Sequence, residues 1–64
     1  MKKNFTIIIT NSVEETAEVR VSCTVEELQT VGKSLADYQR EWYEDYSVVA
    51  YESANVGVEP KWEF

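Results

Sequence analysis

Three pairs of adjacent carboxylates are the residues of this chain that could carry acid–base chemistry. The pairs are Glu14/Glu15, Glu26/Glu27 and Glu44/Asp45. Two neighbouring carboxyl groups can work as general acid and general base when their surroundings separate their pKa values. The chain contains no histidine, the side chain most often used for proton transfer near neutral pH. All three pairs fall where the sequence predicts contact with solvent, so we expect no enzymatic activity.

The residues that would hold a cofactor or a metal ion are also missing. Gly32 and Gly57 are the only glycines, which is too few for a phosphate-binding loop or a dinucleotide fingerprint. Zinc sites draw on cysteine and histidine, and Cys23 is the only cysteine. Calcium loops need several oxygen ligands within a short loop, whereas both aspartates lie in a predicted helix. We therefore expect no cofactor and no bound metal.

Length and charge limit the remaining classes. The chain has 64 residues, with 12 acidic and six basic side chains and a net charge of −6. A chain this short is expected to form one domain, residues 1–64, with little interior to spare for a deep cavity. The negative balance argues against direct binding of nucleic acid, where lysine and arginine supply most of the affinity.

The short apolar stretches and the single cysteine indicate in which cellular compartment the protein is expected. The apolar run at residues 7–9 is too short for a secretory signal, and no stretch reaches the roughly 18 apolar residues of a membrane span. Small secreted domains usually carry several cysteines. We expect a cytoplasmic protein that does not bind membranes.

Alternating apolar residues predict the strands. Residues 4–10 place apolar side chains on both faces and so predict a central strand. Residues 16–23 alternate cleanly, which predicts a half-buried strand paired with the first as a hairpin. A third strand is expected at 47–53, and a fourth at 58–64, where Pro60 favours an edge strand or an extended arm.

A helix is predicted over about 25–45. Thr24 and Glu27 have the spacing of a capping box, and Cys23 and Leu28 have that of a hydrophobic staple. Gly32 lies on the apolar side, where we expect a close approach to the sheet; the alternative is a kink of the helix near Gly32. The apolar side, expected to face the core, comprises Val25, Leu28, Val31, Leu35, Tyr38, Trp42, Tyr43 and Tyr46.

These elements predict a two-layer α+β domain of the order ββαβ(β), with one amphipathic helix on one face of a sheet of three or four strands. A right-handed crossover would place the third strand parallel to a central first strand. That order resembles the β-grasp topology of ubiquitin-like and immunoglobulin-binding domains. The resemblance lies in element order and implies no function.

Seven of the eight aromatic residues follow residue 37. Tyr38 and Trp42 are expected in the core by helical position. Four others are hard to bury together in so small a domain, and aromatic side chains are enriched where proteins meet. They form the candidate interaction patch: Tyr43, Tyr51, Trp62 and Phe64. The alternative is that these side chains simply fill the core.

We therefore expect a small acidic, non-enzymatic module that binds a protein partner or a second copy of itself. Its size would suit an accessory protein of a phage or mobile element. The alternative is an inhibitor whose acidic helix face imitates nucleic acid and blocks a basic groove, although Lys33 and Arg40 interrupt that face. The residues of the acidic face are Glu26, Asp37, Glu41 and Glu44.

Cys23 has two interpretations. It directly precedes the helix, where the helix dipole favours a reactive thiolate. It also continues the apolar row Ala17, Val19 and Val21, which favours a small buried hydrophobic residue.

Overall fold

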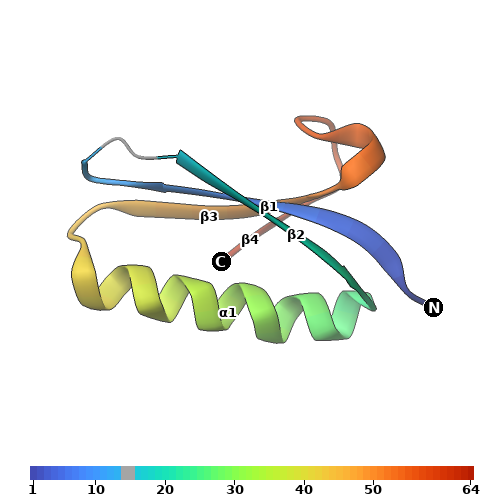
Figure 1. Ribbon diagram of the computed structural model, residues 1–64, viewed down its shortest axis with the longest axis horizontal. Helices are drawn as coiled ribbons and strands as arrows, with labels where there is room; N and C mark the ends of the chain where they lie inside the picture. Colours follow the sequence, from blue (N-terminus) through green and yellow to red (C-terminus); the bar gives the residue numbers. More distant parts are fainter. Residues whose placement is uncertain (14–15) are drawn as a thin grey trace.

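A four-stranded antiparallel sheet with one helix across one face forms this α+β protein (Figure 1). The computed structural model describes residues 1–13 and 16–64. Its elements are β1 (Lys3–Asn11), β2 (Thr16–Cys23), α1 (Val25–Trp42), β3 (Tyr46–Glu52), the 3-10 turn η1 (Ser53–Asn55) and β4 (Lys61–Glu63). The strand order is β2-β1-β3-β4.

The predicted central position of the first strand is confirmed. β1 pairs with β2 on one side and with β3 on the other, and its β-branched residues suit a strand flanked on both edges. The predicted hairpin of the first two strands is likewise present.

The predicted direction of the third strand is wrong, because β3 runs antiparallel to β1. The crossover through α1 joins β2 to β3, and β1 lies between them. β3 is therefore parallel to β2. The all-antiparallel sheet departs from the parallel central pair that the β-grasp resemblance implied.

Two element boundaries differ from prediction by more than one residue. The helix ends at Trp42 rather than near 45, because Tyr43 is extended (φ −134°, ψ 142°) while its amide still donates to the Gln39 carbonyl. The last strand covers Lys61–Glu63 rather than 58–64. Before it, Gly57 has a positive φ of 86° and Val58 donates to the carbonyl of Asn55, so residues 57 and 58 belong to a turn.

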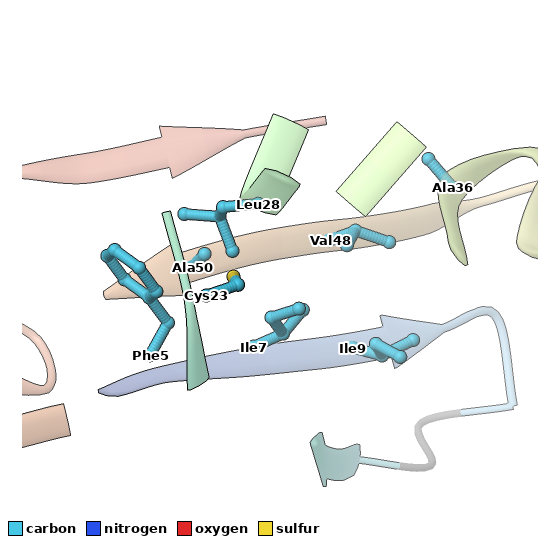
Figure 2. Packing of buried hydrophobic residues seen from close by; sticks show 8 residues of the cluster. All are labelled: Phe5, Ile7, Ile9, Cys23, Leu28, Ala36, Val48 and Ala50. Carbon is cyan, nitrogen blue, oxygen red and sulfur yellow. The ribbon is translucent and has the colours of Figure 1, made fainter. Parts of the chain in front are cut away.

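The core lies between the sheet and α1. Figure 2 shows one layer of side chains from β1, β2, β3 and the helix. Its buried members are Phe5, Ile7, Ile9, Cys23, Leu28, Ala36, Val48 and Ala50. The odd-numbered residues of β1 thus face the helix, as their alternation predicts.

The buried side of α1 is rotated from the predicted one. Its buried residues are Leu28, Gly32, Ala36 and Gln39. Tyr38 and Trp42, predicted to be core residues, are instead 58% and 65% exposed. The small residues Gly32 and Ala36 let other parts of the fold approach the helix closely. The prediction located the core side of the helix from its large apolar residues and therefore did not identify this side.

The start of α1 agrees with prediction. Thr24 Oγ1 accepts from the amide of Glu27, and the Glu27 carboxylate accepts from the amide of Thr24, both at 3.1 Å. This is the capping box.

Among the described residues, no helix has the length and apolar character needed to cross a bilayer.

Candidate functional site

Two large aromatic side chains lie exposed on one flank of α1. The ring centroids of Tyr38 and Trp42 are 6.3 Å apart, tilted by 44°, so the pair forms one continuous apolar surface. Val31 and Leu35 continue this flank towards the start of the helix and are half-buried against the core. Exposed aromatic pairs of this kind are characteristic of surfaces that bind other proteins.

The contacts on the other flank of α1 show towards which edge of the sheet Tyr38 and Trp42 project. Gly32 lies against the ring of Phe64, just beyond β4. Arg40 Nε donates to the Tyr46 hydroxyl of β3 at 3.2 Å. At 100° per residue, Tyr38 and Trp42 each lie about 160° around the helix from Arg40. They therefore project on the β2 side.

The helix leaves β2 largely uncovered. α1 packs mainly on β3 and β1. In Figure 1, β2 is the strand nearest the viewer and β4 is the most distant one. On the helix side of β2, Val19 and Val21 are half-buried and Ala17 is exposed. Together with Tyr38 and Trp42 these three residues make up what we call the α1–β2 face.

The outer edge of β2 is free along its whole length, since the strand pairs only with β1 among the described residues. Phe64 donates its amide to the Val48 carbonyl at 2.9 Å, so the peptide groups of Val48 point towards β4. Peptide directions alternate along strands and match across antiparallel pairs. The N–H and C=O groups of Glu18 and Arg20 consequently point outward, away from β1.

The four aromatic residues of the predicted patch do not share one surface. Trp62 packs edge-on against Phe5 with centroids 5.4 Å apart, and Phe64 lies against Gly32. Tyr51 alternates with Ala50 and therefore lies on the opposite face of the sheet. Tyr43 is half-buried at the end of α1. Their role in binding stays a prediction.

Sequence reasoning missed the α1–β2 face because it assigned Tyr38 and Trp42 to the core. One signal was available. Gly32 and Ala36 lie four positions apart on one side of the helix, and these two compact residues mark the side that approaches other parts of the fold.

The residues of the acidic helix face are all exposed. Asp37 pairs with Arg40 at 3.4 Å, and Glu44 lies past the end of the helix. The row of carboxylates is therefore shorter and partly neutralised. Imitation of nucleic acid stays a prediction without a specific contact in its favour.

The two carboxylate pairs within the described residues lie on the surface. Glu26, Glu27, Glu44 and Asp45 are exposed, while Glu14 and Glu15 lie outside the described residues. The hydrogen bond from the Thr24 amide lowers the pKa of Glu27, which is a capping effect. Across residues 1–13 and 16–64, no three metal-ligating side chains gather at one place.

Cys23 is a buried thiol, 6% exposed. Burial raises the pKa of Cys23, and the nearby charge of Glu27 raises it further. The burial of Cys23 within the core agrees with its interpretation as a small buried hydrophobic residue.

A shallow pocket of about 620 Å³ opens on the face opposite the helix. Thr6 Oγ1 lies 2.8 Å from Ser53 Oγ and ties η1 over this face. Of the described residues that line it, Glu18 and Arg20 are the charged ones. The pocket brings no group of catalytic side chains together.

No protein-family model, curated protein or solved structure matches this chain, so its function has to be inferred from its own residues.

Proposed function

We propose that this protein is a non-enzymatic interaction module that binds another protein chain through its α1–β2 face. The observation that carries the proposal is the exposed pair Tyr38–Trp42 on the β2 side of the helix, together with the apolar row Ala17, Val19 and Val21 of a strand whose outer edge is free among the described residues. Such a surface offers two kinds of contact at once. Aromatic rings supply apolar area at low entropic cost, and the strand edge supplies backbone hydrogen bonds in a fixed register.

The distribution of charge agrees with a protein partner. The face itself has no charged side chain, and its free edge carries one acidic and one basic residue, Glu18 and Arg20. An apolar centre with a charged rim is the usual composition of protein interfaces.

A cytoplasmic location remains part of the proposal, because a single unpaired cysteine is typical of reducing compartments.

Site-specific photocrosslinking in the cells that encode the protein tests this proposal. A photoreactive phenylalanine analogue would replace Tyr38 in one variant and Trp42 in another. The matched control carries the analogue at Val58, which is similarly exposed at 60% but lies in the turn before β4. We expect protein adducts from positions 38 and 42 and few from position 58.

The outcome also separates kinds of partner. An adduct of twice the chain mass identifies a second copy, and an adduct of another mass identifies a different protein. Equal adduct yields at all three positions, or none at 38 and 42, would contradict the proposed face.

A further inference from the structure

We infer that the occupant of the α1–β2 face is a second copy of this chain, whose β2 pairs antiparallel with β2 of the first copy. The inference rests on the proposed function and names its partner. A two-fold axis at Val19 would join the two sheets into one continuous eight-stranded sheet, with both helices on the same side. Identical patches meeting about a two-fold axis are the commonest form of homodimer.

The charges of β2 select one register. With Val19 opposite Val19 of the second copy, Glu18 lies opposite Arg20 and Arg20 opposite Glu18, which gives two cross-strand ion pairs. Shifting the pairing by two residues either way places Glu18 opposite Glu18 or Arg20 opposite Arg20. Like charges directly opposite each other are destabilising in antiparallel sheets. Shifting the pairing by one residue would place the apolar row of β2 in one copy beside the polar row of β2 in the other, because side chains alternate between the two faces of a strand.

The backbone agrees with this register. Glu18 and Arg20 turn their peptide groups outward, and in the register centred on Val19 they become a hydrogen-bonded pair. The same two residues would then share backbone hydrogen bonds and opposite side-chain charges. Val19 would meet its counterpart in a pair without backbone hydrogen bonds, where side chains lie closest together.

The aromatic side chains lie at the end of the molecule where β2 begins. β2 leads directly into α1, so the helix runs back in the opposite direction, and its second half, with Tyr38 and Trp42, lies at the same end of the molecule as the first half of that strand (Figure 1). In the dimer Ala17 lies opposite Val21 of the second copy. The aromatic pair from each copy would cover this apolar pair.

The exposed aromatic side chains supply part of the buried area that a dimer needs. At their present exposures, the four aromatic side chains would together remove roughly 400–600 Å² from water. Standard interfaces bury roughly 1,200–2,000 Å². The two strand edges and their valine rows have to supply the remainder.

The two edges of the sheet differ in a way that favours β2. β4 has three residues, follows Pro60 and begins with Lys61, which are features that protect an edge from pairing. β2 has eight residues without proline or lysine, and its register with β1 is uninterrupted. A long regular edge of this kind is a template for pairing.

Light scattering on a sizing column, combined with charge reversal at two positions, tests the inference. The natural chain is expected to elute at twice 7.4 kDa. Arg20→Glu and Glu18→Arg should each weaken the dimer about tenfold or more, because each places like charges opposite one another. Both side chains are exposed and face the uncharged residues Thr6 and Ile8 of β1, so circular dichroism should show folded variants.

Recombining the charges makes the test specific. An equimolar mixture of the two single variants restores both ion pairs across the interface and should dimerise, as should the double swap Glu18→Arg/Arg20→Glu. Lys33→Glu and Glu26→Arg are the matched controls on the outward side of α1 and should stay dimeric.

Three results would overturn the inference: a monomer at all concentrations, a dimer that survives both reversals, or no rescue in the mixture. The proposed function fails separately, through the crosslinking pattern. Adducts of another mass at positions 38 and 42 would retain the binding face while excluding the second copy.

Discussion

Gln39 places a polar group on the buried side of α1. Its side chain is 8% exposed, and Oε1 accepts no hydrogen bond from the described residues. An unsatisfied buried polar group costs about 1–3 kcal/mol. We expect Gln39→Leu to raise the free energy of unfolding by about 1 kcal/mol, measured by urea denaturation. Gln29→Leu, an exposed position on the same helix, is the matched control and should change little; equal effects would contradict the account.

Gly32 and Phe64 are coupled by direct contact. A methyl group at position 32 would overlap the Phe64 ring, so Gly32→Ala has to displace the ring. Alanine is favoured over glycine within a helix by about 1 kcal/mol. We expect Gly32→Ala to show this gain only in a Phe64→Ala background and to gain less, or lose stability, in the natural chain.

A double-mutant cycle by thermal denaturation measures that coupling. Contacting residues typically show interaction energies of about 0.5–3 kcal/mol. Additive effects of the two substitutions would mean that the ring does not lie against Gly32. The expectation that Gly32 marks a close approach was made from sequence, but the contacting group could not be predicted, because it lies 32 positions further along the chain.

At the scale of elements, the capping box of α1 makes stability depend on pH. The Thr24 amide holds the pKa of Glu27 below its ordinary value. This contribution to stability is therefore present above the ordinary pKa of glutamate, and it is lost as the pH falls through the lowered value. We expect Glu27→Gln, which keeps an acceptor oxygen, to flatten the loss of stability below about pH 4.5.

Denaturation midpoints between pH 2 and pH 6 check this expectation. Glu26→Gln is the matched control, since Glu26 is the neighbouring exposed carboxylate outside the capping box. If both variants lose stability in acid as steeply as the natural chain, the cap does not couple to protonation.

The sequence predicted those features of the fold that depend only on neighbouring residues. The capping residues Thr24 and Glu27 and the alternation of β1 depend on neighbours within a few positions, and both agree with the structure. The rotation of α1 depends on which distant side chains it meets. Phe64 and the sheet select Gly32 and Ala36, so Tyr38 and Trp42 turn outward.

At the scale of the whole molecule, the fold class was predictable and the direction of the third strand was not. Helical and strand patterns indicate two layers but do not say whether the crossover joins neighbouring strands. Inserting β1 between β2 and β3 makes the sheet antiparallel and leaves β2 at an edge. The edge position of β2 already follows from a central first strand, so the candidate site was missed because Tyr38 and Trp42 were assigned to the core.

Residue-resolved amide hydrogen exchange of β2, measured by NMR at several protein concentrations, tests the central claim most directly. The amides of Val19 and Val21 point towards β1 and should be protected at every concentration, which makes them an internal reference. The amides of Glu18 and Arg20 point outward and should become protected as the concentration rises and the second copy binds. If these two amides exchange at unprotected rates at all concentrations, β2 is a free edge and the account of this protein as a β2-paired dimer is wrong.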